Sequence, residues 1–258
     1  MTTSERSTDE EGTGRTVLVT GAAGGLGREF ALGFASRGYR VAITDVAEVG
    51  LKETADLVER AGGEVWYGTG DVTSPESTGQ VAAAVSEFGG GSIDVVVNNA
   101  AIYGTLTRAP LEELDPAEWD LVMNVNLKGP WLVVRACSPY LPEGGRIINL
   151  SSATIYSGSE QWLHYVASKG GVVALTRVMA KELGRRSITA NAIAPGFTLT
   201  DASLSLIEDA ESYGIDRGAL RRASRPDDIV GTALFLAGPD SSFITGQTVV
   251  VDGGRQFI

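Results

Sequence analysis

Tyr165 and Lys169 stand four residues apart in the segment YVASK, inside a helical pattern. On a helix, residues at this spacing lie on one face, so the lysine ammonium would lie near the phenol. A free tyrosine has a pKa near ~10, and a neighbouring cation favours the ionised phenolate. The pair could therefore act as a general base or acid on an alcohol or carbonyl oxygen at neutral pH.

A second candidate group precedes this pair at the end of a predicted strand. The run RIINL (146–150) is followed by Ser151 and Ser152. Ligands of open α/β sheets gather at the carboxyl ends of the strands. Ser152 is therefore expected near a bound ligand, and Ser151 remains a weaker candidate.

A glycine-rich turn follows the first predicted strand, TVLVT (16–20), and leads into a helix. The turn reads TGAAGGLG from Thr20 onward. Glycines in this place allow a tight turn and a close approach of the backbone to a pyrophosphate, which then lies at the helix N-terminus. A dinucleotide site is expected here, formed with Gly21, Gly25, Leu26 and Gly27.

The second predicted strand ends at Asp45. A carboxylate there can accept hydrogen bonds from both hydroxyls of the adenosine ribose, and it repels a 2′-phosphate. No arginine or lysine stands within 21–25 or directly after Asp45 to neutralise such a phosphate. NAD is therefore expected in preference to NADP.

Short apolar runs alternate with longer helical patterns from Arg15 onward, which is typical of a parallel sheet covered by helices on both faces. Strands are expected at 16–20, 39–44, 64–68, 93–97, 146–150, 188–193 and 247–251. Helices are expected at about 25–37, 50–61, 74–88, 116–138, 162–184, 201–213 and 226–238. We predict a flexible polar tail at 1–14, then a single α/β domain at 15–258, a Rossmann-type doubly wound fold with a seven-stranded parallel sheet.

The spacing TGxxxGxG, the YxxxK pair and the strand-end serine resemble the short-chain dehydrogenase/reductase (SDR) family in its classical form. The resemblance extends from about residue 15 to 254. It implies hydride transfer between a nicotinamide cofactor and an alcohol carbon. The catalytic residues it implies are Asn126, Ser152, Tyr165 and Lys169.

The resemblance also implies a role for each of these residues. Tyr165 would be the general base or acid, and Ser152 would polarise the substrate oxygen. Lys169 would bind the nicotinamide ribose hydroxyls and lower the pKa of Tyr165. Asn126 would support a chain of water molecules that leads protons to solvent.

Further cofactor contacts follow from the same resemblance. Asp71 and Val72 stand where the family holds the adenine ring. Asn99 and Ala100 belong to the run NNAA, where the family usually has NNAG, so Ala101 replaces a glycine. The motif PGFTLT resembles the segment that closes over the nicotinamide, with expected contacts from Pro195, Gly196, Thr198 and Thr200. Thr200 could equally cap the helix that follows.

The expected substrate pocket is aromatic and mostly uncharged, with contributions from Tyr103, Thr154, Tyr156, Trp162 and Phe197. No single basic residue stands out as a carboxylate anchor, although Arg108, Arg217, Arg221 and Arg222 are near in sequence. His164 is either structural or part of the pocket or an interface. An aromatic or cyclic secondary alcohol, or its ketone, is the expected substrate.

Two alternatives remain open. Runs such as FITGQTVVVDGG are also similar to bacterial 3-oxoacyl-(acyl-carrier-protein) reductases, which mostly use NADPH; Asp45 weighs against that cofactor. The remote alternative is a non-catalytic dinucleotide-binding sensor or scaffold, which loss of the tyrosine or lysine would have favoured.

The composition excludes several other classes. The formal net charge of −11 repels nucleic-acid phosphates and anionic membranes. A single cysteine, Cys137, and a single histidine leave no disulfide and no Cys-based or His-rich metal site. The N-terminus lacks a signal-peptide pattern, and no apolar run reaches about 18 residues. We expect a cytoplasmic enzyme, and the resemblance implies a homotetramer or homodimer.

Overall fold

The computed structural model describes residues 12–200, 203–204, 209–210 and 212–258. Most of the predicted tail at 1–14 and much of the helix predicted at 201–213 therefore lie outside the described residues. Residues 12–14 form a turn in which the Gly12 N–H donates to the Arg37 carbonyl oxygen at 2.9 Å.

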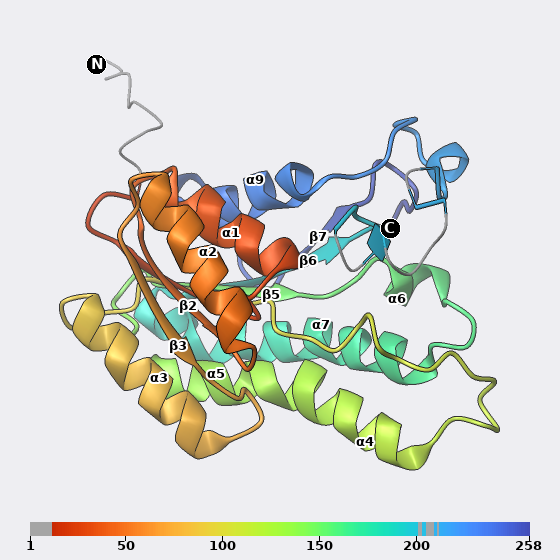
Figure 1. Cartoon of the computed structure of the whole chain (residues 1–258), viewed down its shortest axis with the longest axis horizontal. Coiled ribbons are helices and arrows are strands. Elements are labelled where there is room, and N and C mark those ends of the chain that lie inside the picture. The colour runs from red at the N-terminus through yellow and green to blue at the C-terminus, as the bar shows by residue number, and fades with distance from the viewer. Residues whose placement is uncertain (1–11, 201–202, 205–208, 211) are drawn as a thin grey trace.

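A seven-stranded parallel sheet forms the centre of the molecule, as predicted (Figure 1). Its spatial order is β3-β2-β1-β4-β5-β6-β7, so the direction of winding reverses between β1 and β4. Such a reversal opens a crevice at the carboxyl ends of the strands. The strands are β1 (Thr16–Thr20), β2 (Arg40–Asp45), β3 (Val65–Thr69), β4 (Val95–Asn98), β5 (Arg146–Leu150), β6 (Thr189–Pro195) and β7 (Thr248–Val251).

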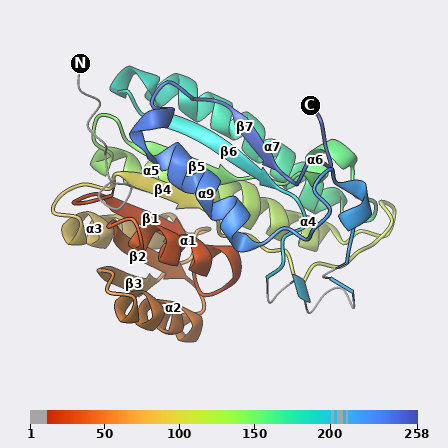
Figure 2. The ribbon, with the colours of Figure 1, turned by 90° about the horizontal axis from the view of Figure 1, so that it is seen from above.

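Helices cover both faces of this sheet, which is why the central strands are apolar without alternation. One core packs α1 (Gly25–Ala35), α2 (Glu48–Arg60) and α9 (Pro226–Ala237) against side chains such as Val17 and Val19. The other packs α3 (Pro75–Phe88), α5 (Gly129–Cys137) and α7 (Leu163–Leu183) against Leu18 and its neighbours. Figure 2 shows the two helical layers on either side of the strands.

Two helix starts follow from their first residues. Ser74 caps α3 by accepting a hydrogen bond from the Ser77 N–H, and Asp115 caps α4 (Pro116–Met123) by accepting one from the Ala117 N–H. A proline occupies the first turn in each case, where its missing N–H costs nothing.

The single helix predicted at 116–138 is in fact interrupted by a π-helical turn, Asn124–Lys128, between α4 and α5. Pro130 explains the break, because proline has no N–H to donate to the carbonyl of Asn126 and its ring would collide with that carbonyl in a regular α-helix. The Gly129 N–H instead donates to the Asn124 carbonyl, five residues back. A short helix, α6 (Thr154–Ser157), was not predicted.

Candidate active site

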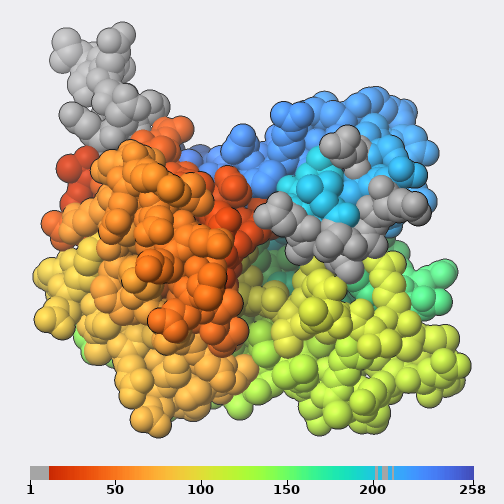
Figure 3. All heavy atoms as spheres, in the orientation of Figure 1, coloured from red at the N-terminus to blue at the C-terminus, as the bar shows by residue number. Residues whose placement is uncertain are grey.

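A cavity of about 850 Å³ opens at the carboxyl ends of the strands. Figure 3 shows a hollow between the red and orange N-terminal half and the yellow-green and cyan segments. The cavity brings together nearly all the predicted site residues: Gly21, Gly25, Leu26, Asp45, Asp71, Val72, Asn99, Ala100, Tyr103, Ser152, Thr154, Trp162, Tyr165, Lys169, Pro195, Gly196, Phe197, Thr198 and Thr200. Gly27, Asn126 and Tyr156 do not line it.

The glycine-rich loop forms a cradle that larger residues would fill. Gly21 has φ +67°, and a Cβ there would lie 2.6 Å from the Ala100 Cα. A Cβ on Gly27 would lie 2.1 Å from the Gly21 carbonyl oxygen, so Gly27 serves close packing beneath the loop rather than the cavity wall. No side chain caps the first turn of α1, and no acidic residue stands in it. Its free N–H groups therefore fit a pyrophosphate.

The loop is held in place from the neighbouring strand by Asn99. Its side-chain amide donates to the carbonyl oxygens of Thr20 at 3.0 Å and Gly21 at 2.9 Å. The Thr20 hydroxyl accepts in return from the backbone N–H groups of Asn99 and Ala100. The ends of β1 and β4 are thus joined at the winding reversal. Asn99, predicted to contact the cofactor, also has this structural function.

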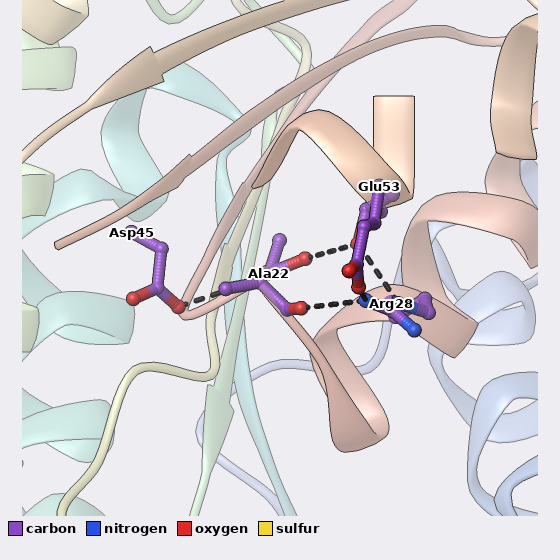
Figure 4. Close-up of polar contacts among 6 residues, drawn as sticks. Ala22, Arg28, Asp45 and Glu53 are labelled. Atoms are coloured by element: carbon purple, nitrogen blue, oxygen red, sulfur yellow. Dashed lines mark hydrogen bonds and ion pairs between the residues drawn. The ribbon is translucent and has the colours of Figure 1, made fainter. Parts of the chain in front are cut away.

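Asp45 lies at one end of the cavity, where its carboxylate accepts from the Ala23 N–H of the glycine-rich loop at 3.1 Å (Figure 4). It also accepts from the Ala47 N–H at 3.0 Å. Arg28, in the first turn of α1 beside the glycine-rich loop, contacts other groups. Its guanidinium donates to the Ala23 carbonyl at 2.9 Å and forms an ion pair with Glu53 at 2.9 Å. Arg28 therefore joins the loop to α2.

Asp71 forms a turn at the same end of the cavity. Its carboxylate accepts from the backbone N–H of Thr73 at 2.8 Å and from the Thr73 hydroxyl at 2.7 Å, while its own N–H donates to the Ser77 hydroxyl. These contacts hold the loop that follows β3, and Val72 lies beside it with 9% of its surface exposed.

Tyr165 projects from α7 toward Ser152, and both side chains are buried. The Ser152 hydroxyl accepts from the Thr154 hydroxyl at 2.9 Å. Burial raises the pKa of Tyr165, and the hydrogen bond with Ser152 lowers it in part. The tyrosine is therefore held as a neutral phenol, ready to donate a proton at neutral pH.

Lys169 is buried one helical turn from Tyr165, with its Nζ 5.8 Å from the tyrosine ring centroid. Its ammonium donates to the Leu150 carbonyl oxygen at 2.8 Å. Burial lowers the pKa of Lys169 to about 8. Burial is the largest influence on the pKa of Tyr165 and raises it, and the role of Lys169 in lowering that pKa stays a prediction.

Asn126 lies in the π-helical turn and links it to the loop after β4. Its side-chain oxygen accepts from the Ile102 N–H at 2.8 Å, and its amide donates to the Ile102 carbonyl at 3.1 Å. The same amide lies 3.4 Å from the Ser168 hydroxyl on α7. Pro130 has no N–H to donate to the Asn126 carbonyl, so the α-helical hydrogen-bond pattern is broken at this point. π-Helical turns are frequent at functional sites.

Two open alternatives can now be compared with the contacts. The Ser151 hydroxyl donates to the Lys169 carbonyl at 2.9 Å, which occupies it structurally, whereas Ser152 faces Tyr165. Thr200 accepts from the Ser203 N–H at 3.3 Å, a capping contact, and it also lines the cavity. The Thr198 hydroxyl donates to the Gly196 carbonyl at 3.2 Å, so it tightens the turn after β6.

Aromatic rings line the cavity around Tyr165. The Trp162 ring centroid lies 5.0 Å from that of Tyr165 and 5.2 Å from that of Tyr103. The Arg108 guanidinium lies over the indole, 4.3 Å from its centroid. Burial raises the pKa of the Tyr103 phenol, although Arg108 opposes this shift. The aromatic side chains Tyr103 and Trp162, expected in a substrate pocket, thus lie together beside Tyr165 and Arg108 in the cavity lining.

Another part of the cavity lining joins predicted residues to Arg255, which sequence reasoning missed. Phe197 packs against Tyr213 with ring centroids 4.8 Å apart, and the Arg255 guanidinium lies 6.0 Å from the Tyr213 ring. Arg217 also lines the cavity. Nothing in the sequence around Arg255 marks it as a site residue, since it follows the last strand and reaches the cavity only through the fold.

Other predicted features lie away from this site. His164 is fully buried on α7, does not line the cavity, and has no hydrogen-bond partner for either ring nitrogen. Within the described residues, no three His, Cys, Asp or Glu side chains gather as a metal site would require. None of the described helices has both the length and the apolar character needed to cross a bilayer.

Comparison with known proteins agrees with the geometry. A family model described as enoyl-(acyl carrier protein) reductase matches residues 21–256. The chain is 38% identical over 244 residues to the (2S)-[(R)-hydroxy(phenyl)methyl]succinyl-CoA dehydrogenase subunit BbsD of Thauera aromatica. The matched residues cover 93% of this chain and 96% of that protein.

Two further proteins are similarly close. The chain is 38% identical over 243 residues to the 3-oxoacyl-[acyl-carrier-protein] reductase FabG of Thermotoga maritima, with 93% of this chain and 97% of that protein covered. A crystal structure of a dehydrogenase/reductase from Sinorhizobium meliloti 1021 superimposes with a TM-score of 0.89 at 34% identity, covering 97% of this chain and 98% of that chain. The similarity therefore extends over almost the whole chain.

Proposed function

The chain belongs to the short-chain dehydrogenase/reductase family, and we propose that it is an NAD-dependent oxidoreductase that interconverts a secondary alcohol and its ketone. It is an oxidoreductase by family; the cofactor choice, the substrate and the residue roles are our proposal. One observation carries it: the hydroxyls of Tyr165 and Ser152 face the same cavity that begins at the glycine-rich loop. A reacting carbon held beside these hydroxyls would lie within reach of a bound dinucleotide.

The proposed mechanism assigns each proton to a side chain. When bound, the dinucleotide supplies or accepts the hydride at its nicotinamide ring. In the reduction direction the Tyr165 hydroxyl gives its proton to the carbonyl oxygen, which the Ser152 hydroxyl also polarises. The raised pKa of Tyr165 suits this donor role. Lys169 would bind ribose hydroxyls with its ammonium, and Asn126 would support the chain of water molecules that returns a proton from solvent.

The preference for NAD depends on the surroundings of Asp45. The cationic residues among the described lining of the cavity are Arg108, Lys169, Arg217 and Arg255, and all belong to its catalytic or substrate end. Arg28, on α1 beside the glycine-rich loop, is paired with Glu53. A 2′-phosphate at this end would meet a carboxylate and no free cation. The proposal therefore excludes NADPH as the preferred cofactor.

The proposed substrate is an aromatic or cyclic secondary alcohol, or the corresponding ketone. The rings of Tyr103 and Trp162 next to Tyr165 support a flat apolar group beside the reacting carbon. The name of the Thauera aromatica relative describes a hydroxyl-bearing carbon attached to a phenyl group, which agrees with this choice. Reduction of a 3-oxoacyl thioester is the second candidate, supported by the name of the Thermotoga maritima relative.

A cofactor-consumption assay tests the proposed function. The full chain is mixed with NADH or NADPH and a panel of aryl ketones, cyclic ketones and acetoacetyl thioesters, and the absorbance of the reduced nicotinamide is followed. We expect faster consumption of NADH than of NADPH with at least one aryl or cyclic ketone. Tight NADH binding with no turnover across the panel would instead favour a non-catalytic sensor.

We also propose that the protein acts in the cytoplasm as a homotetramer. Large apolar side chains are exposed on α4, α5 and α7, as expected of helices that pack against other copies of the chain. They include Leu121, Trp131, Leu163 and Val178, with exposed fractions of 45% to 54%. Light scattering during size-exclusion chromatography should give a mass of four chains; a single-chain mass would contradict this part of the proposal.

A further inference from the structure

We propose that the substrate end of the cavity selects a ketone or alcohol that also carries an anionic group, with Arg108 and Arg255 as the anchors of that anion. This inference rests on the proposed function, because it adds a charge to the proposed substrate. A carboxylate and a phosphate ester share the required chemistry, since both accept paired hydrogen bonds from a guanidinium.

The cavity is electrically polarised along its length. The chain carries a net charge of −11. The carboxylates of Asp45 and Asp71 line the end of the cavity proposed for the adenosine, here called the adenosine end. The substrate end nevertheless carries Arg108, Arg217 and Arg255, against one lining carboxylate, Glu160. Such a concentration of cations in an acidic protein attracts an anionic ligand to that end.

The arginines at this end are free to bind a ligand. Within the described part of the chain, the ion pairs join Arg28, Arg40 and Arg222 to carboxylates, and none involves a cavity-lining arginine. Two other arginines near in sequence differ in this respect. Arg222 is paired with Asp228 at 2.6 Å, and Arg221 donates to the Asp216 carbonyl; neither lines the main cavity.

Arg108 is positioned by an aromatic ring. Its guanidinium lies 4.3 Å from the Trp162 ring centroid, a stacking arrangement that leaves the N–H groups at its edge available. The Ala109 N–H donates to the Gln161 carbonyl at 3.2 Å, which joins the loop of Arg108 to the segment of Trp162. Trp162 in turn packs against Tyr165, so the guanidinium lies one ring away from the catalytic phenol.

The backbone that carries Arg255 is held by the carboxylate of Asp252. The side chain of Asp252 accepts from the backbone N–H groups of Gly254, Arg255 and Gln256 at 2.8 to 3.0 Å. This fixes the backbone of the segment after β7, and the guanidinium reaches the face of Tyr213. A substrate could then place its carbonyl at Tyr165, its apolar part beside the aromatic rings and its anion at Arg108 and Arg255.

The test compares matched ketones that differ in charge. Benzoylpropanoate is paired with its methyl ester, and acetoacetyl coenzyme A is paired with acetoacetyl N-acetylcysteamine, a thioester without phosphates. Reduction by NADH is measured for the wild type, for the double variant Arg108→Gln/Arg255→Gln, and for Arg60→Gln. Arg60 lies at the end of α2 outside the cavity, so this control removes one positive charge elsewhere.

We expect at least one anionic ketone to have a kcat/KM about tenfold or more above that of its neutral match, the size of one charge-assisted hydrogen bond. The double variant should reduce that ratio about tenfold, and the Arg60→Gln control should keep it. Preference for the acid identifies a carboxylate, and preference for the coenzyme A thioester identifies phosphate. Equal turnover of both members of each pair would overturn the inference and leave the proposed function intact.

A binding measurement separates the two proposals if no ketone is reduced. Calorimetric titration of benzoylpropanoate and of coenzyme A into wild type and double variant reports anion binding without turnover. Weaker binding of either anion to the double variant, with unchanged circular dichroism, would support the anion site even if the proposed reaction fails. Equal binding to both proteins, or none to either, would contradict it.

Discussion

The end of the cavity proposed for the adenosine (the adenosine end) and the end proposed for the substrate (the substrate end) are built in different ways. At the adenosine end, consecutive residues of one turn, Gly21 to Gly27, and the end of the adjacent strand supply the backbone cradle and the carboxylate of Asp45. At the substrate end, the walls come from four segments far apart in sequence, carrying Arg108, Trp162, Tyr213 and Arg255. Backbone geometry therefore determines the first end, and side-chain chemistry determines the second.

The largest effect is expected where the two ends meet, at Tyr165. Tyr165→Phe removes the proton donor but keeps the ring that packs on Trp162. Turnover of any active ketone with NADH should fall at least ~10²-fold, the lower end for loss of general acid–base catalysis. Steady-state assays measure this, with Tyr67→Phe on β3, half-exposed and outside the cavity, as the control. Near-normal turnover by Tyr165→Phe would break the assignment of roles.

The backbone character of the adenosine end can be tested with two glycines of one loop. Gly27→Ala places a Cβ 2.1 Å from the Gly21 carbonyl, so the loop must shift; Gly24→Ala meets nothing within 4 Å. Overpacking typically costs about 1–3 kcal/mol. We expect Gly27→Ala to lower the melting temperature and weaken NADH binding about tenfold or more. Gly24→Ala should resemble the wild type in both measurements, and equal effects of the two variants would contradict the cradle.

The choice of cofactor should depend on one charge at the adenosine end. Asp45→Asn keeps an acceptor for the Ala23 N–H but removes the negative charge that repels a 2′-phosphate. The ratio of kcat/KM for NADH over NADPH should fall roughly tenfold, and Asp56→Asn on α2 serves as the charge-matched control. The proposed role of Asp45 would be contradicted if the wild type preferred NADPH. It would also be contradicted if Asp45→Asn left the ratio of kcat/KM for NADH over NADPH unchanged.

The smallest expected effect is a pH dependence at the catalytic end. Burial lowers the pKa of Lys169 to about 8, so its ammonium loses charge as the pH rises through that value, while the raised pKa of Tyr165 keeps the phenol protonated. Ketone reduction as proposed needs the protonated phenol of Tyr165 and the charged ammonium of Lys169. Its kcat should therefore be constant near neutrality and fall severalfold above pH 8. A reduction rate that stays flat up to pH 10 would contradict this assignment.

The same Lys169 shift has a consequence for stability. Its folded pKa lies below the ordinary value near 10.5, so the unfolded chain binds the extra proton between the two values. The stability penalty of burying this charge is therefore present below pH 8 and is relieved as the pH rises toward 10.5. Thermal melts of wild type and Lys169→Met across this range should differ in pH dependence in this direction.

The contrast between the two ends also explains what sequence reasoning could reach. The turn from Gly21 to Gly27 is local, so its spacing predicts its geometry, and the seven strands follow from their apolar runs. The π-helical turn was missed, although Pro130 was the available signal. Arg255 could not be found in this way, because only the fold brings the segment after β7 beside Tyr213.

Internal use of a residue is similarly invisible in sequence. Arg28 stands close to the glycine-rich loop, yet its ion pair with Glu53 depends on how α2 packs beside α1. The opposite directions of the Lys169 and Tyr165 pKa shifts depend on burial, which spacing alone does not report. The sequence thus predicts that Tyr165 and Lys169 lie close together, and the packing around them determines the direction of each pKa shift.

The central claim is that this chain moves hydride between the nicotinamide and a carbonyl carbon next to Tyr165. The direct measurement uses NADH with deuterium at both hydrogen positions of C4 and an aryl ketone, followed by mass spectrometry of the alcohol. The account predicts one deuterium on the carbinol carbon of the wild-type product and at least ~10²-fold less labelled alcohol from Tyr165→Phe. NADH binding with no labelled alcohol from any ketone of the panel, or equal labelling by both proteins, would contradict it.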